Sequence, residues 1–278
     1  MQQLKNYLKK EGNKLSNADT ILELSEVYKT FYPGSINEVK ALTDINLNVR
    51  KGDFITLVGG NGAGKSTLLN AISGQFLPDS GMITVNQKDI TFLHENQRAP
   101  YISRVFQDPK MGTAPSMSVQ ENLSLAYRRG QARKLRYGSS KEERKLFQNQ
   151  LKSLGLGLEN RMNSEIGLLS GGQRQSIALL MATLKRPDIL LLDEHTAALD
   201  PKTARLVLEL TDQKVREMEL TSIMITHNLQ DAITYGNRML VLHHGRIVND
   251  YNQVEKSKLT TESLFSELHA LTVQDVLV

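Results

Sequence analysis

One short segment of the chain, residues 59–67, has the residue types that bind the phosphates of a nucleoside triphosphate. Its four glycines allow the backbone to curl its N–H groups inward around phosphate oxygens. Lys65 is long enough to reach the β- and γ-phosphates, and the hydroxyl of Ser66 is suited to ligate Mg²⁺. The segment reads Gly59, Gly60, Asn61, Gly62, Ala63, Gly64, Lys65, Ser66 and Thr67. This pattern predicts a phosphate-binding loop.

The residues on either side must place this segment between a strand and a helix. Residues 54–58 are apolar and partly β-branched, which is typical of a buried strand. Residues 66–72 have a helical pattern, and the N-terminus of a helix adds positive potential beside phosphates. The alternative is a glycine-rich turn that opens an ordinary helix. The order of strand, loop and helix favours the phosphate-binding loop.

The loop alone indicates only an NTPase or a nucleotide kinase. Two further segments distinguish between the classes of nucleotide-binding protein. Residues 169–175 read LSGGQRQ, and residues 189–194 read ILLLDE. At both segments the chain resembles the ATP-binding cassette (ABC) family, and the resemblance runs from about Ile21 to about Asp250. A non-transport kinase or a switch GTPase is opposed by the LSGGQ segment and by the missing guanine motif N-K-x-D.

The resemblance implies an α/β fold, which is a P-loop NTPase with a recombinase-like core, an N-terminal antiparallel β part and an inserted helical subdomain. We expect the ABC ATPase domain over residues 20–250, with the helical subdomain at about 110–168. Residues 1–19 are expected to be a polar extension that is frayed rather than an interfacial helix, because its few apolar residues bury too little surface. Residues 251–278 are expected to be a C-terminal tail, too short for a regulatory domain.

The resemblance also implies roles for polar residues at the ends of predicted strands. Glu194 is expected to orient or deprotonate the attacking water as general base, and Asp193 to hold Mg²⁺ through water. Gln107 matches the glutamine that contacts Mg²⁺ and the attacking water, and Ser66 is the expected hydroxyl ligand of the metal. His227 matches the switch histidine, which contacts the γ-phosphate. Without the resemblance, a glutamine at a strand end is usually only a surface amide, and a lone histidine there is usually structural.

Further residues are expected to bind ATP, in part from a second copy of the chain. Phe31 is the aromatic residue predicted to stack on adenine, and Tyr32 is the alternative. It is also possible to interpret Phe31 as a residue that only packs in the core or loop. Ser170 begins a predicted helix, where this family binds the γ-phosphate held by the other subunit of a head-to-tail homodimer. Asp200 resembles the D-loop residue that touches the opposite phosphate loop. The residues assigned to ATP are Phe31, Gly59, Asn61, Gly62, Ala63, Gly64, Lys65, Ser66, Thr67, Ser170, Gly171, Gly172, Gln173 and Asp200.

The five histidines outside this set have no assigned chemistry, and specific expectations concern three of them. His195 stands where the family more often has proline; we interpret it as a tolerated loop residue, and the alternative is that it couples hydrolysis to pH. His243 and His244 are adjacent in a predicted strand, so they are expected to point to opposite faces. No group of histidines has metal-ligand spacing, so we expect no metal besides the Mg²⁺ that accompanies ATP.

Charge and composition limit the partners. The net charge is +4, but residues 128–145 hold eight Lys and Arg side chains against two Glu, so the basic character is local. A solvated surface is the favoured reading of this segment, and a face toward the anionic inner membrane surface is second. Nucleic acid is not expected as a partner, because no nucleic-acid-binding motif accompanies the charge. The chain has no cysteine and no apolar run near the roughly 18 residues of a membrane span.

These observations predict the ATP-hydrolysing subunit of a membrane transporter, attached to the cytoplasmic face of the plasma membrane through separate integral membrane permease subunits. Import of a small solute is favoured over export, because residues 165–167 do not resemble the exporter-type X-loop. The motifs resemble importer ATPases of tryptophan/tyrosine-type uptake systems, which implies an extracytoplasmic substrate-binding protein as a further partner. The alternatives are an ABC exporter ATPase and a soluble ABC ATPase acting on nucleic acid.

Overall fold

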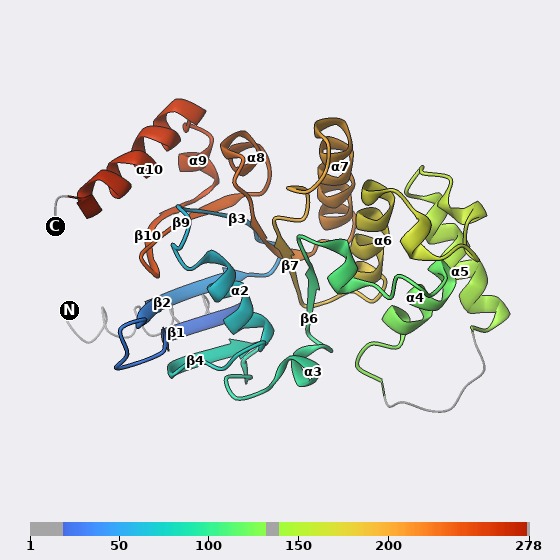
Figure 1. The fold of residues 1–278 in the computed structure, drawn as a ribbon, viewed down its shortest axis with the longest axis horizontal. Helices are drawn as coiled ribbons and strands as arrows, with labels where there is room; N and C mark the ends of the chain where they lie inside the picture. Colours follow the sequence, from blue (N-terminus) through green and yellow to red (C-terminus); the bar gives the residue numbers. More distant parts are fainter. Residues whose placement is uncertain (1–18, 132–138, 277–278) are drawn as a thin grey trace, which may run out of the picture.

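The computed structural model describes residues 19–131 and 139–276, which form two β-sheets surrounded by helices (Figure 1). The strands of the larger sheet are β3 (Phe54–Val58), β6 (Ile102–Val105), β7 (Ile189–Asp193), β8 (Thr221–Ile225), β9 (Arg238–His243) and β10 (Arg246–Tyr251). Their order across the sheet is β10-β9-β3-β8-β7-β6. The strands from β9 to β6 run parallel, and β10 pairs antiparallel with β9 at one edge.

The parallel strands are the most apolar part of the molecule. Strands β3 and β8 are buried over their whole length, and β7 is buried except for its last residue. A parallel sheet that is covered on both faces requires strands of this kind. Because neighbouring parallel strands end at the same edge, the residues that follow β3, β7 and β8 lie close together. That edge carries the predicted phosphate loop, the Asp193-Glu194 pair and His227.

The smaller sheet is antiparallel and packs on the first through one helix. Its strands, in the order β2-β1-β4-β5, are β1 (Thr20–Phe31), β2 (Val39–Arg50), β4 (Ser80–Val85) and β5 (Lys88–Asp89). Helix α2 (Lys65–Ser73) buries Leu68 and Ile72 in one apolar cluster that also contains Ile45 of this sheet and Ile55 of the parallel sheet. The predicted α/β core with an N-terminal antiparallel part is therefore confirmed.

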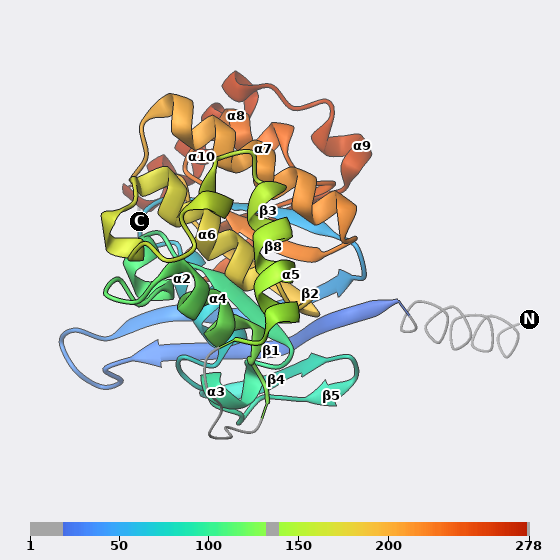
Figure 2. The same ribbon diagram turned by 90° about the vertical axis from the view of Figure 1, so that its right-hand side faces the viewer.

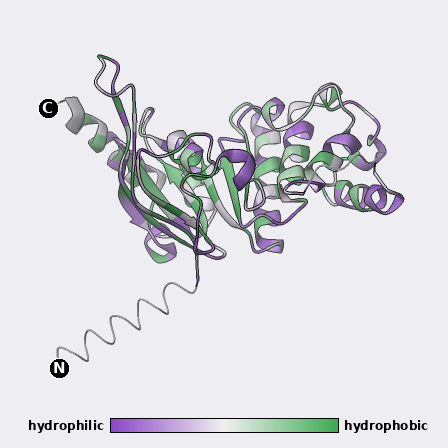
Figure 3. Cartoon of the chain, turned by 90° about the horizontal axis from the view of Figure 1, so that it is seen from below, coloured by the Kyte–Doolittle hydropathy of each residue, from purple (hydrophilic) through white to green (hydrophobic). Residues whose placement is uncertain are grey.

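The opposite face of the parallel sheet carries a second group of helices. Residues alternate along β7, so that Leu191 belongs to the cluster around α2 while Leu190 and Leu192 belong to a second cluster. This second cluster joins the sheet to the outer helices at the other end of the molecule (Figures 1 and 2). The helices are α4 (Val119–Tyr127), α5 (Lys141–Lys152), α6 (Gly171–Thr183) and α7 (Pro201–Glu217). Hydrophobic colour follows the central strands, and hydrophilic colour is frequent on the outer helices (Figure 3).

Short elements connect these layers. Helix α3 (Glu95–Arg98) lies between β5 and β6, and its Arg98 is fully buried against backbone carbonyl oxygens of Ala71, Ile72, Thr91 and Leu93. Burial lowers the pKa of Arg98 to about 10. The 3₁₀ turns are Pro109–Gly112, Leu158–Asn160 and Ile166–Leu168.

The expected C-terminal tail forms helices that pack on the core. Helices α9 (Gln253–Lys256) and α10 (Thr261–Val276) follow β10 in the expected tail, whereas α8 (Leu229–Thr234) follows β8 and precedes the tail. Leu264 of α10 is fully buried in a cluster with Val58 and Val241. Lys256 is also buried; its amine donates to Thr56 Oγ1 at 3.2 Å and to the carbonyl oxygens of Tyr235 and Gly236. Burial lowers the pKa of Lys256 to about 8.

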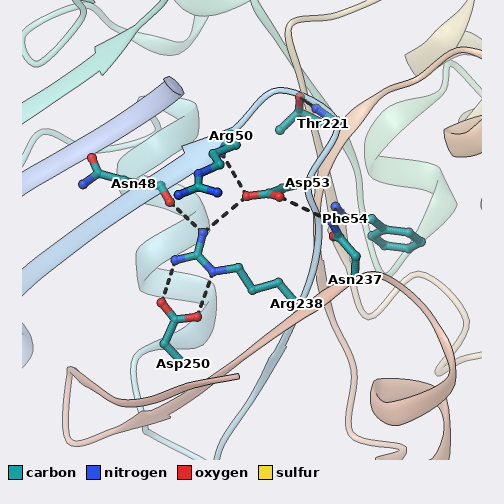
Figure 4. A network of polar contacts seen from close by, with 9 residues as sticks. Asn48, Arg50, Asp53, Phe54, Thr221, Asn237, Arg238 and Asp250 are labelled. Atoms are coloured by element: carbon teal, nitrogen blue, oxygen red, sulfur yellow. Dashed lines mark hydrogen bonds and ion pairs between the residues drawn. The ribbon is translucent and has the colours of Figure 1, made fainter. Parts of the chain in front are cut away.

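A polar network fastens the antiparallel sheet to the parallel one (Figure 4). Arg238 of β9 donates to both carboxylate oxygens of Asp250, at 2.7 and 2.6 Å, and to the carbonyl oxygen of Asn48 at 2.6 Å. Its Nη1 also lies 3.3 Å from Oδ2 of Asp53, in the turn between β2 and β3. The hydrogen bonds to Asp250 raise the pKa of Arg238. This fork-like pairing fixes both sheets relative to the strand that leads into the phosphate loop.

One expectation about surface side chains is wrong. The rings of His243 and His244 contact each other, with centroids 4.3 Å apart, because β9 ends at His243 and His244 turns with a φ of +45°. They therefore do not point to opposite faces of a strand. In the basic segment 128–145, Lys141, Arg144 and Lys145 are exposed, in keeping with the favoured reading of a solvated surface. Arg129 is half-buried and donates to the carbonyl oxygens of Ala182 at 3.1 Å and Lys185 at 2.7 Å.

Two expectations fall on residues that the structure does not describe. Residues 1–18 of the expected polar extension and residues 132–138 of the basic segment lie outside the described ranges. Within residues 19–131 and 139–276, no helix combines the length and the apolar character needed to cross a membrane.

Candidate functional site

The loop between β3 and α2 has the conformation that its glycines make possible. Gly62 and Gly64 have φ angles of +77° and +101°, which residues with a Cβ rarely adopt. A Cβ on Gly64 would lie 2.5 Å from the carbonyl oxygen of Ala41, and one on Gly59 would lie 2.2 Å from that of Leu242. The loop thus runs so close to neighbouring backbone that these two positions admit only glycine.

Lys65 begins helix α2 and is buried. Its amine donates to the carbonyl oxygens of Gly59 at 2.8 Å and Gly60 at 2.9 Å, so the side chain folds back across the loop that precedes it. Burial lowers the pKa of Lys65, and the carboxylates of Glu194 and Asp193 oppose that shift. The amine is therefore held at the point where the loop, the acidic pair and the start of α2 meet.

The acidic pair and His227 lie at the edge where the parallel strands end. Asp193 is the last residue of β7, and Glu194 follows it with a φ of +45°. Nε2 of His227, which follows β8, lies 2.6 Å from Oε1 of Glu194. The carboxylate is largely buried, whereas about half of the histidine side chain is exposed. This pair can hold a water molecule and accept its proton beside the phosphate loop.

An open cavity of about 430 Å³ brings these groups together with the tip of the antiparallel sheet. It is lined by Phe31, Tyr32, Val39, Ala41, Asn61, Gly62, Ala63, Gly64, Lys65, Ser66, Thr67, Glu194 and His227. The lining of the cavity therefore combines aromatic rings, the phosphate loop, a carboxylate and a histidine. Val39 and Ala41 were not among the predicted residues; small apolar side chains in a strand have no pattern that would single them out.

Both candidate aromatic residues line this cavity, but they differ in their surroundings. The Phe31 ring packs edge-on against Phe76, with centroids 5.3 Å apart at 86°. Tyr32 is 70% exposed and has a φ of +52°. Phe31 thus has a fixed orientation, whereas Tyr32 projects from the turn that follows β1.

Other predicted residues do not line this cavity. Gln107 follows β6 and is exposed. Asp193 is paired with an arginine that the sequence analysis did not single out: Nη2 of Arg104 lies 2.5 Å from Oδ2 of Asp193. A single arginine in an otherwise ordinary strand carries no sequence signal of such a contact.

The LSGGQ segment is also separate from the cavity within one chain. Ser170 is the N-cap of α6, and its hydroxyl accepts from the backbone N–H of Gln173 at 3.3 Å while the Gln173 side chain bonds back to the N–H of Ser170. A Cβ on Gly172 would lie 2.0 Å from Cγ2 of Thr203 on α7, so this position requires glycine for packing. Gly171 precedes it at the start of α6. The residues that line the cavity include none of these four.

Asp200 caps the next helix. Its carboxylate accepts from the backbone N–H of Thr203 at 3.1 Å, and the hydrogen bonds with Thr203 lower the pKa of Asp200. The side chain is exposed at the start of α7, directly after the loop that follows Glu194. Asp200 and Ser170 are thus both exposed helix caps, which leaves them free to meet another surface.

His195 lies in the loop after β7, as expected, but its side chain is buried there. It is only 2% exposed, and its Nε2 lies 3.0 Å from Oγ1 of Thr211 on α7. The Thr211 hydroxyl donates to the carbonyl oxygen of Val207 at 2.8 Å, so it accepts from the histidine, and Nε2 carries the proton. Burial lowers the pKa of His195 to about 4. His195 is therefore a neutral packing residue that joins the Glu194 loop to α7, and its burial opposes the alternative in which it senses pH near neutrality.

Comparison with known proteins gives a consistent result. The family described as ABC transporter matches residues 42–197. A tyrosine transport ATP-binding protein of Clostridioides difficile is 44% identical over 89% of this chain and 98% of its own length. Methionine import ATP-binding protein MetN 2 of Enterococcus faecalis is 36% identical over 83% of this chain and 64% of its own length.

Solved structures are similar over most of the chain. The ATP-binding cassette MJ0796, in a dimeric post-hydrolysis state bound to ADP and Pi, has a TM-score of 0.72 at 30% identity and covers 84% of this chain and 99% of its own. The structure of cbiO1 from Clostridium perfringens, part of the ABC transporter complex cbiONQ, has a TM-score of 0.70 at 29% identity. The match covers 93% of this chain and 94% of the cbiO1 chain.

Proposed function

The chain belongs to the ABC transporter family and is an ATPase of that family, and on this premise we propose that it powers the import of a small amino-acid-type solute. The observation that carries the proposal is the cavity in which the phosphate loop, Glu194 and His227 meet. The solute class rests on the similarity to a tyrosine transport ATP-binding protein.

We assign the hydrolytic roles from the geometry of that cavity. The backbone of residues 59–64 and the amine of Lys65 bind the phosphates, and Phe31 stacks on the adenine. Glu194 accepts a proton from the attacking water, while His227, at 2.6 Å, holds the carboxylate and the water in place. Because Glu194 is largely buried beside Lys65, the proton transfer takes place in a site partly screened from solvent.

We propose that Mg²⁺ accompanies ATP, because the available side chains suit it. The hydroxyl of Ser66 and the carboxylate of Asp193 supply oxygen ligands, the type that Mg²⁺ takes in proteins. The exposed Ser66 begins α2 beside Lys65, and Asp193 ends the neighbouring part of the sheet. Gln107 joins this set from the end of β6. When bound, the metal neutralises negative charge on the β- and γ-phosphates.

We propose a head-to-tail homodimer with two composite ATP sites. The support is that Ser170 and Asp200 are exposed helix caps that lie outside the cavity of their own chain. The N-terminus of α6 can then bind the γ-phosphate held by the partner's loop. A related cassette was solved as a dimer bound to ADP and Pi.

We propose that the permease subunits bind a second hollow, located on the side of β6. This groove of about 320 Å³ lies between β6 and α4 and includes Phe106, the neighbour of Gln107. Leu125 of α4 lines this groove and is 55% exposed, so an apolar side chain is available there. Attachment at this groove would hold the ATPase at the cytoplasmic face of the membrane. A substrate-binding protein on the other side would complete the importer.

Co-purification tests the proposal against its alternatives. The tagged chain, expressed with its genomic neighbours and extracted in mild detergent, should retain an integral membrane protein and no nucleic acid. ATP hydrolysis by the reconstituted complex should rise with tyrosine or tryptophan supplied through the binding protein. Recovery of nucleic acid without a membrane protein would favour the soluble ABC ATPase, and outward solute movement would favour the exporter.

A matched pair of surface variants tests the groove. Leu125→Glu should abolish retention of the membrane protein while leaving ATP binding unchanged, because Leu125 does not line the nucleotide cavity. Val248→Glu is the control, since Val248 of β10 is 38% exposed at the opposite edge of the sheet. Equal retention of the membrane protein by both variants would place the permease elsewhere.

A further inference from the structure

Arg104 is a buried cation that touches the acidic end of β7. It comes from β6, which pairs in parallel with β7 and places Arg104 opposite Leu191. Nη2 lies 2.5 Å from Oδ2 of Asp193, and the two side chains are 9% and 13% exposed. Among residues 19–131 and 139–276, the side chain that donates a hydrogen bond to the Asp193 carboxylate is Arg104.

The same guanidinium group also holds the helix that begins with Lys65. Nη1 donates to Oδ1 of Asn70 at 2.6 Å and to Oε1 of Gln75 at 3.2 Å, at the end of α2. The planar guanidinium group of an arginine holds its donors in a rigid fork, whereas the ammonium group of a lysine is a single point at the end of a flexible side chain. Arg104 therefore sets the position of Asp193 relative to α2.

A third contact reaches Phe106, which lies between the end of β6 and Gln107. The guanidinium carbon lies 4.8 Å from the centre of the Phe106 ring, a distance at which a cation and an aromatic face attract each other. Nε of Arg104 is buried without a hydrogen-bond partner among the described residues. A buried donor without a partner is unfavourable, so Nε does not stabilise this orientation of the guanidinium group. The contacts with Asp193, Asn70 and Phe106 must therefore hold the group in place.

We propose that Arg104 is a positioning residue for Asp193 and thereby sets the affinity of the nucleotide site for Mg²⁺. By holding Oδ2, it leaves Oδ1 as the oxygen available to the metal and its bound water. Groups that hydrogen-bond a metal-ligating side chain fix its orientation, and their removal typically lowers metal affinity by about 10- to 100-fold. The inference rests on the proposed function, in which Asp193 holds the metal that accompanies ATP.

Binding of Mn²⁺, a spectroscopic substitute for Mg²⁺, tests the inference without turnover. Free Mn²⁺ is followed by electron paramagnetic resonance in the presence of saturating non-hydrolysable ATP analogue. Arg104→Gln should raise the Kd for Mn²⁺ by about tenfold. In EDTA, the Kd for the analogue should stay within about twofold, because the phosphate loop and Lys65 do not contact Arg104.

Two more variants separate positioning from a structural role. Arg104→Lys keeps the charge without the fork, so its Kd for Mn²⁺ should fall between wild type and Arg104→Gln. Gln75→Ala removes the weakest contact of Arg104, at an exposed residue, and should bind Mn²⁺ as wild type does. Thermal unfolding would reveal whether Arg104→Gln folds. If it does not fold, Arg104→Lys replaces it in the test, and an unchanged Kd for Mn²⁺ in Arg104→Lys would contradict the inference.

Each outcome has a definite meaning. An unchanged Mn²⁺ affinity in Arg104→Gln would overturn the role of Arg104 while leaving the proposed function intact. An equal loss of analogue affinity in EDTA would also overturn it, since the defect would then lie in the fold of the loop. A wild-type protein that binds no analogue with Mn²⁺ would overturn the proposed function itself.

Discussion

Nε2 of His227 lies 2.6 Å from Oε1 of Glu194, and the two residues follow the ends of the paired strands β8 and β7. Glu194 has a φ of +45°, a left-handed conformation that costs a residue with a Cβ about 1–2 kcal/mol. Its backbone is held by hydrogen bonds with Ile225 and Ala197, at 3.2 and 2.9 Å. The strained backbone and the histidine together fix where the carboxylate points, which is the requirement for a general base.

Replacing the Glu194 carboxylate should separate ATP binding from hydrolysis. Glu194→Gln keeps the shape of the side chain and loses the base, so the rate of hydrolysis should fall by about 10²–10⁴-fold. ATP affinity should be retained, and the dimer should persist in the presence of ATP. Release of phosphate and dimer content by size-exclusion chromatography measure the two effects.

A second glutamate provides the control for this change. Glu209→Gln alters the same functional group at an exposed position on α7 and should hydrolyse ATP at the wild-type rate. Unchanged turnover in purified Glu194→Gln would remove Glu194 from the catalytic role.

Loss of the aromatic ring at position 31 should weaken the binding of ATP more than the binding of triphosphate. Stacking on a base contributes about 1–3 kcal/mol, so Phe31→Ala should raise the Kd for ATP by about tenfold. The Kd for inorganic tripolyphosphate should change little, because the phosphate loop is untouched. Calorimetric titration with both ligands measures the difference.

Tyr32→Ala is the matched variant, because Tyr32 lines the same cavity. If Tyr32→Ala alone weakens ATP binding, the stacking residue is Tyr32 and the register predicted from the sequence is off by one. An equal loss of affinity for tripolyphosphate in Phe31→Ala would indicate damage to packing against Phe76 rather than loss of stacking.

Two inactive variants should restore activity when mixed. Lys65→Ala and Ser170→Arg should each hydrolyse almost no ATP, since every composite site takes Lys65 from one subunit and Ser170 from the other. In a mixed dimer one site has both defects and the other is intact. Random pairing makes about half the dimers mixed, so about a quarter of wild-type activity should return if the sites act independently.

The mixing experiment depends on subunit exchange, which is confirmed first with ATP-free monomers carrying two fluorophores. Ser170→Arg also removes the cap of α6, so its melting temperature must be compared with that of wild type. No recovery under demonstrated exchange, in single-turnover as well as steady-state assays, would contradict the head-to-tail arrangement.

His195 should make the protein less stable in mild acid. Its pKa is about 4 in the folded protein and 6.5 in the unfolded chain, so between these values the unfolded chain binds more protons. The stabilising effect of the neutral ring is fully present above pH 6.5 and is lost as the pH falls toward 4. At pH 5 the loss amounts to about 2 kcal/mol.

The variant His195→Gln separates the pH dependence of stability caused by His195 from the pH dependence caused by acidic side chains. Glutamine can donate to Thr211 but does not titrate, so the fall in unfolding free energy between pH 7 and pH 5 should be smaller by about 2 kcal/mol than in wild type. Urea unfolding at the two pH values gives both free energies. Parallel pH dependence in the two proteins would show that His195 is not held neutral.

Local sequence determined the elements around the phosphate loop. The apolar run before Gly59, the glycines and the periodic helix after Lys65 are consecutive, so short-range sterics and hydrogen bonding specify them without help from distant residues. The predicted helix start at Ser170 follows for the same reason, because a serine cap with a glutamine three residues later is a local pattern. The strand β7, which ends at Asp193, can likewise be predicted from its continuous apolar run.

Tertiary structure alone decided which side chains meet. The loop position of His195 could be predicted from the sequence, but its burial against Thr211 could not, because that contact depends on where α7 packs. Nothing local marks Arg104 as the partner of Asp193, since the two are 89 residues apart and meet through the pairing of β6 with β7. The sequence did not predict the C-terminal helix either, because its Leu264 packs in a cluster with Val58 of β3, which lies far earlier in the sequence. Such contacts come from close packing in three dimensions, which no periodicity along the chain records.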